Sequence, residues 1–88
     1  MARLFFALLA LPLFAAPAYA EFPCDELWGE RNAIYDDAGY CFKTARGREA
    51  FDNSDCQYDS LEDVPLSARD RQKIAEIQRE ERRNDCLR

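Results

Sequence analysis

Apolar residues recur at steps of three and four between residues 24 and 38, and this spacing predicts the first helix of the chain. The face that they share also contains an arginine, and its members are Cys24, Leu27, Trp28, Arg31, Ile34, Tyr35 and Ala38. We expect the helix to start near Pro23 or Cys24, because Pro is tolerated in the first turn. Gly39 should end it in a left-handed cap.

A second, more polar helix is predicted from Ala68 to about Asp85, where acids and bases are mixed and Gly and Pro are absent. Ser67 is a suitable N-cap, and with Asp70 it resembles a capping box. The apolar stripe is narrow and passes into polar positions: Ile74, Ala75, Ile77, Gln78, Glu81, Cys86 and Leu87. Such a helix packs one seam against a partner and leaves the rest in water.

The segment between these helices is less regular. The spacing within Lys43–Phe51 allows a short helix, but Gly47 inside it costs about 1 kcal/mol relative to Ala, so helix and loop both stay open. From Asp52 to Asp63 the acids have no Lys or Arg among them, which indicates a solvated loop. A calcium site is the alternative, but the alternating ligand spacing and central Gly of a calcium loop are missing.

The first 20 residues have the layout of a secretory signal peptide. An Arg near the start precedes an apolar block from Leu4 to Phe14, and the pattern Ala18-Tyr19-Ala20 predicts cleavage after Ala20. A membrane anchor is the alternative, but two Pro residues interrupt a stretch already short for the ~20 apolar residues of a spanning helix. We therefore predict a signal peptide, residues 1–20, and an exported domain, residues 21–88, with no membrane span after cleavage.

All four cysteines, Cys24, Cys41, Cys56 and Cys86, lie in the exported domain. A domain of about 60 residues buries only ~60% of the surface that its unfolded chain exposes, so its core alone gives a thin stability margin. An even number of Cys residues in a small exported domain indicates a disulfide framework. A four-thiolate metal site is the alternative, but the chain has no Cys-x-x-Cys pair and no His. We expect no metal or other cofactor.

Two helices in so short a chain should pack as an antiparallel pair. The start of the first helix then lies beside the end of the second, which favours pairing Cys24 with Cys86 and Cys41 with Cys56. Four cysteines allow three connectivities, and their spacing alone does not choose among them. The predicted fold is all-α, a small disulfide-stabilised antiparallel helical pair with a cross-linked middle loop or short helix.

The antiparallel register brings two charged residues at core-facing positions to about the same height. Arg31 lies on the apolar face of the first helix, and Glu81 lies on the seam of the last. A buried charge is tolerated only when it is paired, so we predict an ion pair between Arg31 and Glu81. The alternative is that both side chains extend into the solvent.

A family resemblance is carried by the same helix and the residues after it. The matching residues are Leu27, Arg31-Asn32-Ala33-Ile34-Tyr35, Gly39-Tyr40 and Phe42, and they resemble the YARHG domain, a small extracytoplasmic bacterial family named for its central motif. Phe51 falls where the family has an aromatic pair, and Leu66-Ser67 with Ile74, Ile77 and Glu81 resembles its closing helix. The resemblance implies a fold and an exported location, and it implies no established activity.

The chain departs from the family at the central motif. Its five motif positions read Tyr35-Asp36-Asp37-Ala38-Gly39, so the Ala, Arg and His of the family are replaced. The residues kept in and just before the motif include Arg31, Asn32, Ile34, Tyr35 and Gly39. A ligand role that the family's Arg and His had would therefore be absent here.

Charge and residue types exclude several classes of function. The chain has 17 Asp and Glu against 12 Lys and Arg, of which one Arg lies in the signal, so the exported domain carries a net charge of −6. This balance disfavours nucleic acid and anionic membrane surfaces as partners. Without His there is no Ser-His or Cys-His nucleophile. Asp36 and Asp37 are adjacent on a helix and cannot face each other as an acid–base couple, so we expect no enzyme.

We predict a non-catalytic binding module of the bacterial envelope, periplasmic or extracellular, whose partner is a protein or a cell-wall component. The alternative is an inhibitor of an exported lysozyme- or protease-type enzyme, which would present a rigid loop. The contact candidates for that loop are Lys43, Arg46 and Arg48, although surface bases more often serve solubility. Trp28 and Tyr40 belong to the apolar face and to the segment after the cap, which favours a core position for both.

Overall fold

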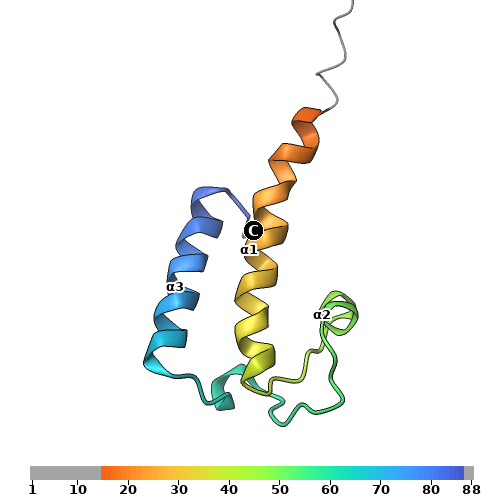
Figure 1. Cartoon of the computed structure of the whole chain (residues 1–88), viewed down its shortest axis with the longest axis vertical. Coiled ribbons are helices and arrows are strands. Elements are labelled where there is room, and N and C mark those ends of the chain that lie inside the picture. Colours follow the sequence, from red (N-terminus) through yellow and green to blue (C-terminus); the bar gives the residue numbers. More distant parts are fainter. Residues whose placement is uncertain (1–14, 87–88) are drawn as a thin grey trace, which may run out of the picture.

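The structure, a computed structural model, describes residues 15–86. This part contains the helices α1 (Ala15–Asp37), α2 (Ala45–Ala50) and α3 (Ala68–Arg83) and the 3-10 helix η2 (Leu61–Asp63). Within it the only β pairing is a single bridge between Tyr40 and Tyr58. Helices α1 and α3 lie side by side and antiparallel, and α2 lies on the opposite side of α1 (Figure 1). The prediction of an all-α helical pair is confirmed.

Helix α1 begins at Ala15, about two turns earlier than the sequence predicted. The expected start near Pro23 or Cys24 was wrong, since Pro23 lies inside the helix. Pro removes one helical hydrogen bond there, and the Ala-rich residues before it favour helix strongly. Of the predicted signal peptide, residues 1–14 lie outside the described residues. No helix between residues 15 and 86 has the length and apolar character needed to cross a membrane.

Gly39 ends α1 in a Schellman motif. Its φ is +99°, and the backbone N–H groups of Gly39 and Tyr40 donate to the carbonyl oxygens of Asp36 and Tyr35, each over 3.0 Å. The ring centroids of Tyr35 and Tyr40 lie 6.1 Å apart, which supplies the apolar contact that accompanies this motif. The predicted left-handed cap is confirmed, and it turns the chain back along α1.

The middle segment folds into the short helix α2, one of the two forms that the sequence left open. The Thr44 hydroxyl caps it by accepting a hydrogen bond from the Gly47 backbone N–H over 3.0 Å. Gly47 packs directly on Phe42, so that a Cβ added there would lie 2.8 Å from the Phe42 ring. The ring of Phe42 is stacked on that of Phe51, with centroids 4.9 Å apart. A glycine that weakens the helix intrinsically is therefore needed for its packing.

The predicted loop from Asp52 to Asp63 is a loop only as far as Ser60. Its last three residues form the 3-10 helix η2 instead. Ser60 caps η2 there, its hydroxyl accepting from the Glu62 backbone N–H over 3.3 Å. Ser67 caps α3 in the predicted way, accepting from the Asp70 N–H over 3.0 Å. Helix α3 then ends at Arg83, two residues earlier than expected.

The buried core is small, as expected for a domain of this size. Its members are Phe42, Val64, Ile74, Ile77 and one charged residue, Glu81. Two disulfides supplement it. Cys24 is bonded to Cys86 with 5.4 Å between their Cα atoms, and Cys41 to Cys56 with 5.0 Å. The first ties α1 to the end of α3, and the second closes the middle segment on itself.

Candidate functional site

An ion pair joins the two long helices beside the core. The Arg31 Nε lies 2.9 Å from Glu81 Oε1, and the Arg31 Nη2 lies 3.0 Å from Glu81 Oε2. Glu81 is 1% exposed, whereas the Arg31 side chain keeps 18% of its surface in the solvent. This bidentate pairing holds the guanidinium in one orientation and leaves both Nη1 hydrogens and one Nη2 hydrogen for other partners.

Arg31 lines a hollow of about 230 Å³, which we call the aromatic hollow. Four elements contribute to it: α1, the segment after its cap, η2 and α3. The lining residues are Trp28, Arg31, Asn32, Tyr35, Tyr40, Phe42, Lys43, Thr44, Leu61 and Gln78. Aromatic walls with a few convergent polar groups are the usual composition of a ligand site.

The rings of the aromatic hollow are held by one another. Tyr40 meets Phe42 edge-on, with centroids 5.0 Å apart, and Trp28 lies 6.0 Å from Phe51. The Arg46 guanidinium covers one face of Trp28 at 3.9 Å. At the rim, Leu61 is the large apolar side chain that remains most exposed among the described residues. These contacts support the walls of the hollow, and its lining includes one exposed apolar side chain.

Two amide side chains face the aromatic hollow from different helices. Asn32 on α1 donates its Nδ2 to the Trp28 carbonyl oxygen over 2.9 Å, and within residues 15–86 its Oδ1 accepts no hydrogen bond. The side-chain amide of Gln78 on α3 has no hydrogen-bond partner among the described residues. Gln78 is nonetheless partly buried. Polar groups of this kind are satisfied either by water or by a bound ligand.

The three basic residues predicted as contacts each bind within the chain. Arg46 also pairs with Asp25 over 3.0 Å, and the Arg48 Nε donates to the Phe42 carbonyl oxygen over 3.4 Å. Lys43 lines the aromatic hollow and lies 3.8 Å from the Asp59 carboxylate, with both side chains largely in the solvent. With the Arg46 contact to Trp28, these three bases make four contacts within the chain.

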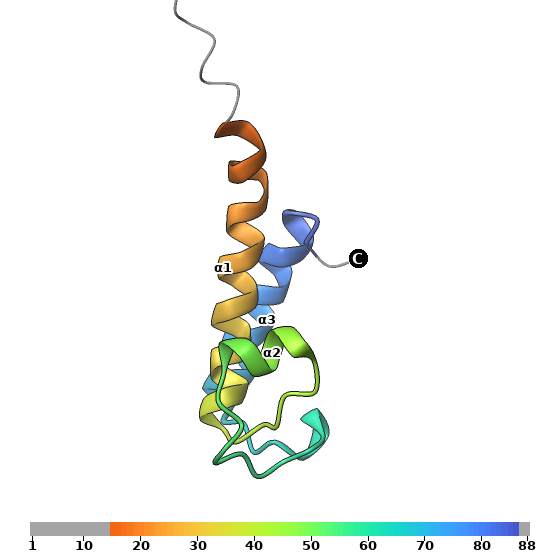
Figure 2. The ribbon, with the colours of Figure 1, turned by 90° about the vertical axis from the view of Figure 1, so that its right-hand side faces the viewer.

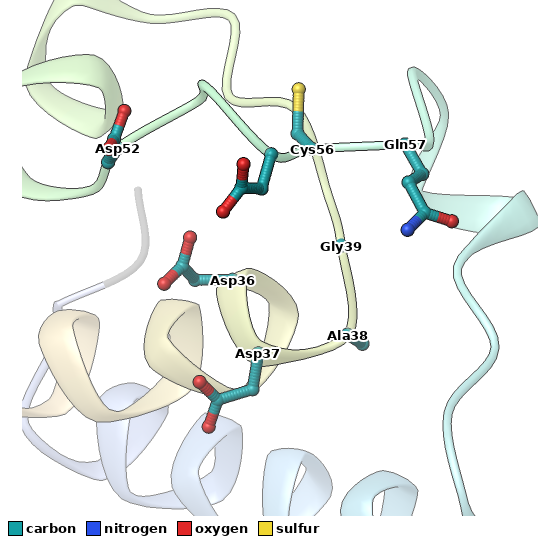
Figure 3. A pocket seen from close by; sticks show the side chains of 8 residues that line it. Asp36, Asp37, Ala38, Gly39, Asp52, Cys56 and Gln57 are labelled. Carbon is teal, nitrogen blue, oxygen red and sulfur yellow. The ribbon is translucent and has the colours of Figure 1, made fainter.

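A second, acidic hollow of about 410 Å³ lies at the end of α1 (Figure 3). Its lining is Asp36, Asp37, Ala38, Gly39, Asp52, Asp55, Cys56 and Gln57. The Asp36 carboxylate points into the hollow and that of Asp37 points away from it (Figure 3). Among the described residues, no group of three or more His, Cys, Asp and Glu side chains is arranged to hold a metal ion.

Electrostatics differ between the acids of this hollow. Burial raises the pKa of Asp36 above its ordinary value of 3.8, and the charges of Asp37 and Asp52 raise it further. Asp52 has a lowered pKa, because the Ser54 backbone N–H and hydroxyl both donate to its carboxylate over 2.9 Å. The hollow therefore favours a proton on Asp36 before one on Asp52.

The residues of the motif divide between the two hollows. Tyr35 lines the aromatic hollow, whereas the three departures from the family, Asp36, Asp37 and Ala38, all line the acidic one. Sequence analysis did not predict that Asp52 and Asp55 lie beside Asp36. The one indication was the expected Cys41–Cys56 disulfide, which holds this part of the loop near the end of α1.

A third hollow, of about 570 Å³, lies along the other side of the α1–α3 pair. Its lining is Glu30, Ala33, Ile34, Arg69, Asp70, Lys73 and Ile77. Of the residues that resemble the family, it contains three apolar ones, Ala33, Ile34 and Ile77. The aromatic hollow contains five, Arg31, Asn32, Tyr35, Tyr40 and Phe42, and these include groups that can form hydrogen bonds to a ligand, which makes it the stronger candidate for a binding site.

Comparison with protein families gives one match: the model of the YARHG domain covers residues 3–82. No curated protein and no solved structure shows significant similarity to the chain. The matched residues include every residue that lines the aromatic hollow and the acidic hollow.

Proposed function

Because the chain belongs to the YARHG domain family, we propose that it is a small exported module of the bacterial envelope that binds a protein or a cell-wall component without catalysing a reaction. Its two disulfides support export, since such bonds form and persist in oxidising compartments. The compartment is the periplasm or the medium outside the cell.

The aromatic hollow is the observation that carries this proposal. It combines rings held by mutual contacts, a guanidinium oriented by Glu81 and two amides from facing helices. A site formed in advance loses little conformational entropy when it binds. The charged residues in its lining are Arg31 and Lys43, so it lacks the acid–base couple that hydrolytic chemistry would need.

Enzyme inhibition is the second candidate and has weaker support. The middle segment is rigid enough for an inhibitory loop, since the Cys41–Cys56 disulfide and the Phe42–Phe51 stack hold it. Its bases are engaged, however: Arg46 binds Asp25 and covers Trp28, and Arg48 binds a backbone carbonyl. Breaking these contacts on docking would cost part of the binding energy.

The test compares two glutamines of α3. Gln78 lines the aromatic hollow, and Gln72 is exposed on the same helix. Purified oxidised protein is sedimented with isolated cell-wall sacculi and, separately, incubated with immobilised envelope proteins. We expect retention that Gln78→Ala reduces and Gln72→Ala leaves unchanged. Equal retention of the two variants, or none for the wild type, would contradict the proposal.

A parallel assay distinguishes the inhibitor hypothesis from the binding-module hypothesis. The same protein is added to a panel of lysozymes and proteases, and the residual enzyme activity is measured. Inhibition that disappears in Arg46→Ala and Arg48→Ala but persists in Gln78→Ala would favour the inhibitor and count against the aromatic hollow.

A further inference from the structure

The size of the aromatic hollow limits what it can hold. Its volume of about 230 Å³ lies below the range of ~300–1,000 Å³ that is typical of pockets for drug-sized ligands. It has room for one ring-sized unit, with the remainder of a longer ligand extending past the rim. The exposed Leu61 lies on that rim.

The charges around the hollow favour a neutral ligand. Its two bases, Arg31 and Lys43, each have an acid of the chain beside them, Glu81 and Asp59 respectively. Glu81 and Asp59 already balance these two positive charges, so a carboxylate ligand would add an uncompensated negative charge close to both acids. A cationic ligand would meet bases, because no carboxylate lines the hollow.

The polar groups of the hollow favour hydroxyl and amide partners. The side-chain amide of Gln78 has no partner in the described structure and offers both a donor and an acceptor, and Asn32 offers its Oδ1. A purely apolar ligand, such as a leucine side chain of a peptide, would cover these amides without pairing them, at a cost in affinity. A ring with an apolar C–H face and a rim of hydroxyl and acetamido groups would pack on Tyr40 and pair with both amides.

We propose that the aromatic hollow binds one neutral N-acetylated sugar ring of a glycan chain, with the acetamido group at Gln78 and the C–H face on Tyr40. This inference rests on the proposed function, because it takes the hollow to be the binding site. The inference does not allow a peptide ligand in this hollow, and the test includes peptide binding as an outcome that would contradict it.

Fluorescence of Trp28 provides the readout, since this is the only Trp of the chain and it lines the hollow. The oxidised protein is titrated with the N-acetylglucosamine trisaccharide and with the glucose trisaccharide. At ~0.3 kcal/mol per heavy atom, one N-acetylated ring should give a dissociation constant of about 0.5 mM. We expect weaker binding of the glucose form, a loss of about five- to tenfold in Gln78→Ala, and no change in Gln72→Ala.

The side-chain amide signals of Asn32 and Gln78 in NMR spectra give a second readout. We expect both to shift on titration with the N-acetylated trisaccharide. The inference is overturned if neither fluorescence nor these signals respond at about ten times the expected dissociation constant, or if Gln72→Ala weakens binding as much as Gln78→Ala. Retention of the protein on immobilised envelope proteins through Gln78 without any sugar response would overturn this inference and leave the proposed function standing. If the protein neither responds to the sugar nor is retained through Gln78, the sugar inference and the proposed function both fail.

Discussion

Replacing Glu81 by Ala tests how much of the fold depends on the ion pair between α1 and α3. Glu81 is 1% exposed and binds Arg31 through both carboxylate oxygens. Removing one partner of a buried pair costs about 3–5 kcal/mol, because the other charge stays buried without compensation. The Arg31 side chain is 18% exposed and partly recovers hydration, so we expect a loss of about 3 kcal/mol.

This loss is large for the domain. At ~0.05–0.15 kcal/mol per residue, a domain of this size has a free energy of unfolding of roughly 3–10 kcal/mol. With a urea dependence of about 1 kcal/mol per molar, Glu81→Ala should lower the midpoint of urea unfolding by about 3 M. Circular dichroism of the oxidised protein follows the transition.

The neighbouring acid is the matched control. Glu80 pairs with Arg83 on the surface of α3, where the Arg83 and Glu80 side chains are 72% and 46% exposed, so Glu80→Ala should cost less than about 1 kcal/mol. Replacing both members of the buried pair by Leu and Met should recover much of the loss, since no buried charge then remains. If Glu81→Ala and Glu80→Ala unfold at the same urea concentration, the pair is not a structural element of this fold.

Three further sets of substitutions test the packing, the cross-links and the acidic hollow. Gly47→Ala should lower the free energy of unfolding by about 1–3 kcal/mol, because its Cβ would lie 2.8 Å from the Phe42 ring; Gly29→Ala should raise it by about 0.5–1 kcal/mol, since nothing lies within 4 Å of the added Cβ. Thermal melts of the two variants check this, and a shift in the same direction for both would contradict it. Removing the Cys24–Cys86 disulfide, which spans 62 residues, should cost about 4 kcal/mol, against about 3 kcal/mol for Cys41–Cys56, which spans 15; urea unfolding of the two double Ser variants should rank them in this order, and the reverse order would refute the chain-entropy reasoning. Asp36→Asn should stabilise the protein by less than about 1 kcal/mol near neutral pH. The pKa of Asp36 is raised in the folded state, so its charge opposes folding above that pKa, and the gain should vanish as pH falls below the unfolded value of 3.8; a gain that persists in acid would be inconsistent with it.

The features that could be predicted from the sequence depend on the spacing of residues that are close together in the chain. The cap at Gly39 and the N-cap at Ser67 need only a few adjacent residues. The helical pair needs only two apolar stripes and a chain too short for another arrangement. Once the pair is antiparallel, the register that joins Cys24 to Cys86 also brings Arg31 to Glu81.

The features that the sequence did not reveal depend on the path of the middle segment. Gly47 weakens a helix in isolation, and only its contact with Phe42 explains why α2 contains it. Both hollows form where this segment passes the C-terminal half of α1, so their linings combine residues from distant parts of the chain. Single members of the aromatic hollow do stand out in the sequence, such as the contact candidate Lys43 and Gln78, a polar residue on the apolar stripe of α3, but their convergence does not. The sequence does not reveal the start of α1 at Ala15, because a Pro more often stands in the first turn of a helix than inside one.

Chemical-shift mapping of the oxidised protein with solubilised cell-wall fragments tests the central claim most directly, because it compares all faces of the domain at once. In Figure 2, α2 lies in front of the lower part of α1 and α3 lies behind it, so α2 and α3 are on opposite sides of α1, as in Figure 1. We predict shifts at Asn32, Tyr40 and Gln78, which line the aromatic hollow. Shifts confined to Asp36 and Asp52 in the acidic hollow, or to Arg46 and Arg48 on α2, would contradict the account.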